Sequence, residues 1–310
     1  MSDENLAEIR NEKAKKIQHP KGKLTAYERL NLLLDEGSFS EIDQHVASDE
    51  NPEGEAVITG TGTIHGRPVF VFSEDFSVMG GSLGEVVAKK ILKIMDHALE
   101  ARAPIIGIKD SGGARIQEGI SSLFGYAQIF KKNVEASGKV PQISVVVGPS
   151  AGGAVYSPAL TDFIFQVKDI GQLYVTGPAV VKTVTGEDVT FEELGGVEAH
   201  GTKSGVTHQV CETEEQAFEE IRYLMSFLPQ SSSQKPPMFI TEDEPSRVIE
   251  SLDSFIPENR NQPYDMEKII LDIVDDGEHY PIQSNYATNI ITSFARINGN
   301  TTGIVANQPM

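Results

Sequence analysis

Two glycine-containing turns, each placed directly after a short apolar run, constrain this chain more than any other feature. The first run, residues 105–109, leads into Asp-Ser-Gly-Gly-Ala-Arg at 110–115, and the second, residues 143–147, leads into Gly-Pro-Ser-Ala-Gly-Gly-Ala at 148–154. A short run rich in β-branched residues predicts a buried strand, and a stretch compatible with a helix follows each turn. This order of strand, turn and helix predicts an α/β fold with mainly parallel strands.

The same turns are suited to binding a negative charge. Glycine has no Cβ, so a ligand can approach the backbone closely. The helix that follows directs unpaired N–H groups and the positive end of its dipole toward that ligand. Two such turns can aim backbone donors at one developing negative oxygen, which is the layout of an oxyanion hole.

A third glycine turn, residues 79–84, lies earlier in the chain. It precedes a predicted amphipathic helix that ends at Ala103-Pro104, just before the first of the two strands. Residues 61–72 predict a hairpin with a turn near His65-Gly66.

The charge balance limits the ligands and partners. The formal net charge is −19 and the pI is near 4.8, which disfavours nucleic acid and anionic membranes. The one cysteine, Cys211, cannot form an internal disulfide or a cysteine-based zinc ribbon, and no cluster of histidines or carboxylates has metal-ligand spacing. No metal is therefore expected. No apolar run could span a bilayer or serve as a signal-peptide core, so we expect a cytoplasmic protein.

An internal repeat and a linker predict the domain organisation. The hairpin beginning Thr63-Ile64-His65-Gly66 is echoed by Arg296-Ile297-Asn298-Gly299, and a polar, proline-ended linker at 230–237 lies between them. We expect a complete N-terminal domain over residues 1–235 and a linker with an acidic connector over 236–280. Residues 281–310 are expected to start a second, truncated domain, because one hairpin cannot form a domain.

Other interpretations of the second glycine turn stay open from the residues alone. Residues 148–152 match the G-x-S-x-G nucleophile elbow of an esterase, with Ser150 as the nucleophile. The triad would be completed by an aspartate and a histidine further along, Asp162 or Asp188 with His200 or His208. Alternatively, the glycines only permit tight packing of helices on the sheet. The elbow is disfavoured because two-glycine turns are frequent in α/β folds and an elbow does not need Gly153.

Six stretches of the chain carry a resemblance to a known family. The chain resembles the β-type carboxyltransferase subunits of biotin-dependent acyl-CoA carboxylases, most closely the propionyl-CoA carboxylase group. The matching stretches are distributed over nearly the whole of residues 20–230: Lys23–Leu30, Gly80–Glu85, Lys93–Ala98, Asp110–Gly119, Gly148–Asp162 and Thr183–Gly196.

The resemblance implies two crotonase-like domains in tandem, of which this chain would hold one and the truncated start of the second. The first domain would bind a short acyl-CoA, such as propionyl-CoA or acetyl-CoA. The second would receive carboxybiotin from the biotin carrier of a biotin carboxylase subunit, so that no cofactor is bound covalently here. It further implies a homo-oligomer, a hexamer in the family, or completion by a separate chain that carries the C-terminal half.

The site residues implied by the resemblance lie in the three glycine turns. Backbone N–H groups of Gly152, Gly153 and Ala114 are expected to stabilise the enolate at the thioester oxygen. Contacts to CoA are expected from the turns and nearby, namely from Gly81, Ser82, Gly84, Gly112, Gly113 and Arg115. Lys89 and Lys93 are further candidates for the CoA phosphates, with surface ion pairs as the alternative for these basic residues.

Two alternative functions use the same motifs. One is the α subunit of a biotin-dependent acyl-CoA decarboxylase of the methylmalonyl-CoA type, which runs the same half-reaction in reverse. The other is an inactive truncated remnant or assembly subunit, suggested by the short C-terminal region. The acyl-chain preference cannot be read from the sequence.

Overall fold

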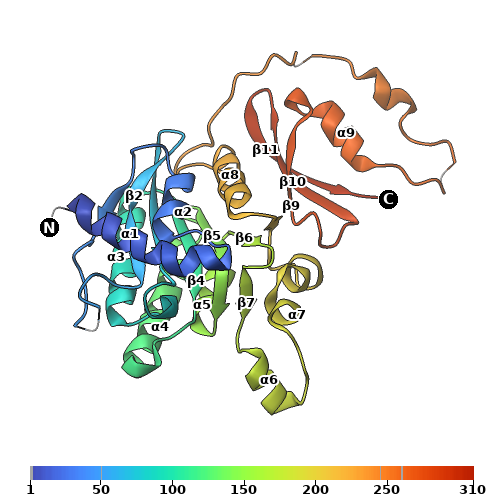
Figure 1. Cartoon of the computed structure of the whole chain (residues 1–310). Helices are drawn as coiled ribbons and strands as arrows, with labels where there is room; N and C mark the ends of the chain where they lie inside the picture. Colours follow the sequence, from blue (N-terminus) through green and yellow to red (C-terminus); the bar gives the residue numbers. More distant parts are fainter. Residues whose placement is uncertain (1–2, 50, 245, 260) are drawn as a thin grey trace.

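Eight strands form one mixed sheet in the computed structural model, which describes residues 3–49, 51–244, 246–259 and 261–310. Residues 1, 2, 50, 245 and 260, which fall within the expected segments, lie outside the described residues. The strands are β1 Ser40–Ile42, β2 Val57–Ile64, β3 Arg67–Glu74, β4 Ile105–Ser111, β5 Gln142–Ala151, β6 Phe163–Val167, β7 Gln172–Tyr174 and β8 Gln209–Cys211 (Figure 1).

The sheet has an antiparallel start and a parallel continuation. Strands β1, β2 and β3 pair antiparallel, and β4, β5, β6 and β8 then follow in parallel. The short strand β7 pairs in parallel with the end of β5. The predicted α/β fold with mainly parallel strands is therefore confirmed. Right-handed βαβ crossovers need helices on the faces of such a sheet.

Helices cover both faces of the sheet (Figure 1). On one face, α2 (Ala26–Leu33) and α8 (Glu214–Met225) bury Leu30 and Phe218 against Val71 and Val145. On the other face lie α3 (Glu85–Ala101), α4 (Ile120–Ala136) and α5 (Gly153–Ala159), which share a second apolar core. The N-terminal helix α1 (Asp3–Gln18) leads into this arrangement, and α6 (Pro178–Thr185) and α7 (Phe191–Gly195) follow β7.

Strand β5 runs further than the sequence predicts. The apolar run ends at Val147, whereas β5 continues through Gly148 to Ala151. The reason is the pairing with β7, which places Pro149 opposite Gln172 and Ala151 opposite Tyr174. Hydrogen bonds from a neighbouring strand thus extend β5 into the glycine turn.

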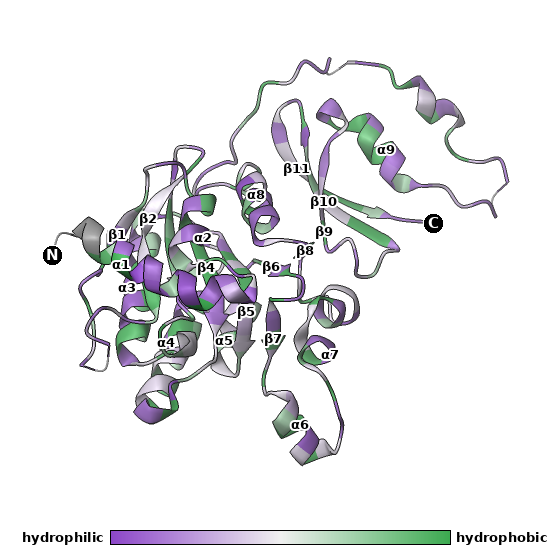
Figure 2. Cartoon of the chain, in the orientation of Figure 1, coloured by the Kyte–Doolittle hydropathy of each residue, from purple (hydrophilic) through white to green (hydrophobic). Residues whose placement is uncertain are grey.

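The internal repeat is larger in the structure than in the sequence. A second, three-stranded sheet has the order β11-β10-β9, with β9 His279–Ile282, β10 Ile290–Ile297 and β11 Asn300–Asn307. Strands β10 and β11 have the same lengths and antiparallel pairing as β2 and β3, and each begins 233 residues later. The helix α9 (Met266–Ile273) precedes them and, like α2, is eight residues long. Alternating polar and apolar residues along α9 are visible in Figure 2.

The two copies share even the capping of their hairpin turns. Asp35 accepts hydrogen bonds from the backbone N–H groups of His65 and Gly66, at 3.1 and 2.8 Å. Asp275 does the same for Asn298 and Gly299, at 2.9 and 2.7 Å. All four turn residues have positive φ, as a two-residue hairpin turn of this kind requires. We infer that α9 and the second sheet form a structural duplicate of α2 and β1–β3.

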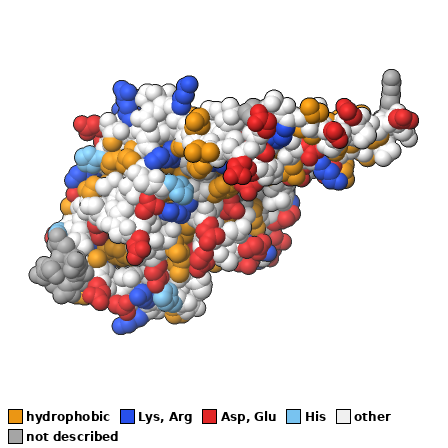
Figure 3. All heavy atoms as spheres, turned by 90° about the horizontal axis from the view of Figure 1, so that it is seen from above, with side chains coloured by type: hydrophobic (Ala, Val, Ile, Leu, Met, Phe, Trp, Pro, Cys, Tyr) orange, Lys and Arg blue, Asp and Glu red, His pale blue; other side chains and the backbone are white. Residues whose placement is uncertain are grey.

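The segment between the linker and α9 is extended. Its described residues include a short 3-10 helix, Glu250–Ser254, and several exposed apolar side chains, Met238, Ile240, Val248 and Ile256. Seen from above, it projects from the body and carries acidic and apolar side chains (Figure 3).

Candidate functional site

The two principal glycine turns lie side by side at one edge of the sheet. They follow the neighbouring parallel strands β4 and β5, where Ser111 pairs with Ser150. A Cβ at Gly113 would lie only 2.7 Å from the carbonyl oxygen of Ala151, so the two turns are in direct contact. The juxtaposition predicted from the order of strands and turns is therefore present.

The third glycine turn is joined to the first by backbone hydrogen bonds. Gly112 N–H donates to the Gly80 carbonyl at 2.9 Å, and Leu83 N–H donates to the Gly113 carbonyl at 2.9 Å. A Cβ on Gly81 would overlap the carbonyl oxygen of Asp110. Gly81 thus allows close packing of two backbone segments, and the Gly112 N–H already donates to Gly80.

Two of the three predicted oxyanion donors have free N–H groups in the described structure. Ala114 forms an isolated parallel bridge with Leu83, in which the N–H and carbonyl of Leu83 make both bonds. The N–H of Ala114 therefore points away from Leu83. Gly153 is the first residue of α5, where an N–H has no acceptor within the helix.

The N–H of Gly152, which was also predicted as a donor, is engaged within the protein. Its N–H donates to the carbonyl oxygen of Tyr174 at 3.1 Å, because β7 pairs with the end of β5. Gly152 instead supplies the backbone conformation that starts α5, with φ of 56° and ψ of −120°. Only glycine adopts this region readily. The candidate donors are therefore Ala114 and Gly153.

Arg115, which was predicted to contact CoA, is likewise engaged within the protein. Its side chain is buried, and the guanidinium donates to Glu55 at 2.8 Å and to Glu118 at 2.9 Å. The carbonyl of Ser82 accepts from the same group at 3.3 Å. A guanidinium that is buried between two carboxylates has no donor to offer a phosphate at the surface.

The amino end of α3 is also engaged by a side chain of the protein, the carboxylate of Glu118. Glu118 accepts a hydrogen bond from the N–H of Glu85 at 2.6 Å, and a Cβ on Gly84 would overlap the Glu118 carboxylate. A protein carboxylate therefore lies beside Gly84, where the sequence suggested a contact with CoA. Lys89 and Lys93 form exposed ion pairs, with Glu85 and Asp43 respectively, each at 2.6 Å.

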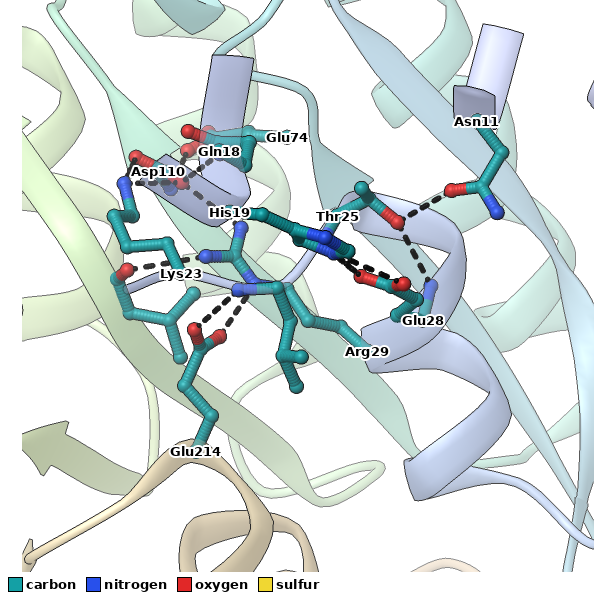
Figure 4. A network of polar contacts seen from close by, with 12 residues as sticks. Asn11, Gln18, His19, Lys23, Thr25, Glu28, Arg29, Glu74, Asp110 and Glu214 are labelled. Atoms are coloured by element: carbon teal, nitrogen blue, oxygen red, sulfur yellow. Dashed lines mark hydrogen bonds and ion pairs between the residues drawn. The ribbon is translucent and has the colours of Figure 1, made fainter. Parts of the chain in front are cut away.

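A buried ionic cluster beneath the turns is the feature that sequence reasoning missed (Figure 4). Asp110 accepts from Lys23 at 2.7 Å and from Arg29 at 2.9 Å, and Arg29 also donates to Glu214 at 2.6 Å. Glu74 pairs with Lys109 and accepts from the Asp110 N–H. The six charged groups balance, which lowers the cost of burying them. The charged pair Lys109-Asp110 at the end of an apolar run was the available signal.

Burial changes the protonation equilibria of this cluster, which we name the Asp110 cluster: Lys23, Arg29, Glu74, Lys109, Asp110 and Glu214. Loss of solvation lowers the pKa of Lys23 and raises the pKa of Glu214 and Glu74. Opposite charges nearby act against each of these shifts. A hollow of about 550 Å³ borders the cluster at Lys23 and Glu214 and does not reach the glycine turns.

The esterase interpretation fails on geometry. Ser150 is fully buried, and its hydroxyl has no hydrogen-bond partner among the described residues. His208 accepts from the Ile164 N–H through Nδ1, and His200 contacts the Leu173 carbonyl and Ser204. The two aspartates are also engaged elsewhere, Asp162 with the Gln142 N–H and Asp188 with Lys182.

Any catalytic activity of the assembled protein is accordingly expected to be mostly retained in Ser150→Ala. The hydroxyl is out of reach of a substrate and of any histidine, and a nucleophile requires both. Turnover of the variant should be compared with wild type, together with labelling of the wild-type chain by a fluorophosphonate. A complete loss of turnover, or labelling at Ser150, would restore the elbow interpretation.

Within the described parts of the chain, no group of three or more histidine, cysteine or acidic side chains is arranged to hold a metal ion. None of the helices described is both long and apolar enough to cross a membrane. Cys211 is buried, and burial raises the pKa of its thiol to about 12.

Comparison with known proteins shows the family. The model described as "Carboxyl transferase domain" matches residues 17–310, and the chain belongs to this family. It is 56% identical over 301 residues to the propionyl-CoA carboxylase beta chain of Cereibacter sphaeroides, covering 94% of this chain and 59% of that protein. It is 53% identical to the methylmalonyl-CoA decarboxylase subunit alpha of Veillonella parvula, covering 99% of this chain and 62% of the relative.

A solved structure of the transcarboxylase 12S hexamer, with methylmalonyl-coenzyme A bound, superposes with a TM-score of 0.93 at 45% identity. The match covers 99% of this chain and 62% of that one. The expected crotonase-like fold and the resemblance to β-type carboxyltransferase subunits are confirmed. The chain spans about 59% of the length of the propionyl-CoA carboxylase relatives it matches.

Proposed function

We propose that the chain supplies the acyl-CoA site of a carboxyltransferase that moves CO2 from carboxybiotin to the α-carbon of a short acyl-CoA, such as propionyl-CoA or acetyl-CoA. The observation that carries this proposal is the contact between two glycine turns that leave the N–H groups of Ala114 and Gly153 unpaired. The similarity to propionyl-CoA carboxylase beta chains supports the substrate class.

The proposed chemistry needs charge stabilisation more than a titrating side chain. Removal of the α-proton places negative charge on the thioester oxygen, and two fixed N–H donors stabilise that enolate without reorganisation. Carboxybiotin on a carrier protein would provide CO2, and the ureido nitrogen that it leaves would accept the α-proton. No side chain of this chain is then required as the base, in agreement with the buried and paired state of Asp110 and Glu74.

The surface beside the turns supports a partner chain at the site. Four large apolar side chains on the first turn of α4 and just before it are more than half exposed, namely Ile116, Ile120, Leu123 and Phe124. Nearby, Phe124 and Lys89 line a hollow of about 240 Å³ between α3 and α4. An apolar strip of this kind marks an interaction site. We propose that it is covered by another subunit, or by a chain that carries the C-terminal half.

The decarboxylase alternative has its own support, because the Veillonella relative covers 99% of the chain. The same donors would stabilise the same enolate in that reaction. The two functions differ in their partners: a biotin carboxylase for the carboxylase, and further decarboxylase subunits for the alternative. Co-purification of the native protein with one or the other decides between them.

Calorimetric titration of the purified chain tests the acyl-CoA site. We expect propionyl-CoA and CoA to bind without added metal, whereas acetate gives no heat, because the nucleotide portion supplies most of the contact area. A folded sample that is silent toward both CoA compounds contradicts the proposal. Circular dichroism, recorded on the same sample, verifies the fold.

A further inference from the structure

All three glycine turns meet at one buried residue, Asp110. Its carboxylate lies under the backbone of Gly148, where a Cβ would overlap Oδ1. Its carbonyl oxygen lies against Gly81, where a Cβ would overlap as well. Asp110 itself lies near the end of β4 and is the first residue of the first turn.

Each polar group of Asp110 is fixed by a different part of the chain. The N–H donates to Glu74 at the end of β3, at 2.9 Å. The carboxylate accepts from Lys23, from Arg29 and from Gln18, the last at 3.0 Å (Figure 4). A carboxylate with three such donors has a single low-energy orientation, because any rotation leaves a buried charge unpaired.

Asp110 does not itself reach a substrate. It is fully buried, and its charge is neutralised by Lys23 and Arg29. The donors proposed for the oxyanion hole lie four residues further on, at Ala114, and five residues beyond Gly148, at Gly153. Asp110 begins the first turn, and its carboxylate lies against Gly148, the first residue of the second turn. The distance between the starts of the two turns therefore depends on Asp110, and so does the distance between the two N–H groups.

We propose that Asp110 is a positioning residue that holds the three glycine turns at the spacing required for the oxyanion hole. The inference rests on the proposed function. A displacement of about 1 Å of a catalytic group can reduce the rate about 100-fold. The Asp110 cluster thus acts through the backbone of the turns and not through proton transfer.

The test compares Asp110→Asn with the double variant Asp110→Asn/Lys23→Met and with Asp35→Asn as a control. In the assembled enzyme, Asp110→Asn is expected to lower kcat about 100-fold with little change in the KM for the acyl-CoA. The double variant removes both charges, so it is expected to recover thermal stability without recovering kcat. Asp35→Asn weakens a hairpin cap far from the turns and is expected to lower stability while leaving kcat unchanged.

Hydrogen exchange on the purified chain provides a readout that is independent of activity. Faster exchange at residues 80–84, 112–115 and 148–155 is expected in the double variant, and not in Asp35→Asn. Recovery of kcat together with stability in the double variant would mean that Asp110 only balances charge, and the inference fails. If the wild type binds no acyl-CoA, the proposed function fails, and unchanged exchange at the turns then rejects the positioning role separately.

Discussion

Replacing Arg115 with methionine is expected to lower the free energy of unfolding by about 3–5 kcal/mol. The guanidinium and the Glu55 carboxylate are almost completely buried, at 1% and 0% side-chain exposure, and lie 2.8 Å apart. Methionine fills similar space but leaves Glu55 as an unpaired buried charge. Because the chain has no tryptophan, urea unfolding should be followed by circular dichroism.

The pH dependence of this loss identifies its cause. Although burial opposes ionisation, hydrogen bonds from Arg115 hold the pKa of Glu55 below its usual value. The stabilisation from such a carboxylate is present above the unfolded pKa, about 4.3, and is lost as the pH falls. The difference between wild type and Arg115→Met should therefore shrink below about pH 4.3.

Lys89→Met is the matched control, since it breaks the exposed pair with Glu85. Exposed pairs contribute little, so its stability should stay close to wild type. A loss at Arg115→Met no larger than that of the control would show that the buried Arg115–Glu55 pair is not stabilising. It would also leave Arg115 available for the CoA contact that the sequence suggested.

The architecture was predictable because its signals are local. Apolar runs, glycine turns and hairpin turns each act within a few neighbours, and the structure confirms the hairpin over residues 61–72 and the helix that follows the third glycine turn. The repeat of the His65-Gly66 hairpin was visible for the same reason. Its extension to α9 was not, because α2 and α9 share a role and a length but little sequence.

In the candidate site, only the arrangement of the backbone turns was predictable from the sequence. The contact between the two glycine turns follows from strand order, and Ala114 and Gly153 keep their N–H groups unpaired. Side-chain partners were not predictable, since Arg115 meets Glu55 from a loop 60 residues away. Likewise, Gly152 loses its donor to β7, a three-residue strand whose partner is set by the tertiary fold.

The same tertiary contacts determine which substitution tests the oxyanion hole. A side chain in Gly153→Val would keep the thioester oxygen away from the proposed N–H donors. However, a Cβ at Gly153 would lie 2.6 Å from the ring of Tyr126, which is buried in the second apolar core. Such a variant would disturb the packing of α4 and could not separate catalysis from folding.

Gly113→Ala is the sharper substitution, and it is expected to lower kcat of the assembled enzyme about 100-fold. A Cβ there would lie 2.7 Å from the Ala151 carbonyl oxygen, so the first turn must move away from the second. The φ of +102° adds strain of about 1–3 kcal/mol for a residue other than glycine. Both effects separate the N–H of Ala114 from that of Gly153, and the enolate loses one of its two donors.

Gly186→Ala is the control that separates backbone strain from the contact with the Ala151 carbonyl oxygen. Gly186 also has a positive φ, of +80°, but lies at the end of α6 with no atom within 4 Å of the added Cβ. Its loss of stability should reflect strain alone, and its kcat should remain at the wild-type value. Equal kcat for both alanine variants would show that contact between the turns is unimportant, and the oxyanion hole would then have to be placed elsewhere. A loss confined to Gly113→Ala ties the spacing of the turns to the chemistry, because strain from a positive φ is common to both variants, whereas only Gly113 faces the Ala151 carbonyl oxygen.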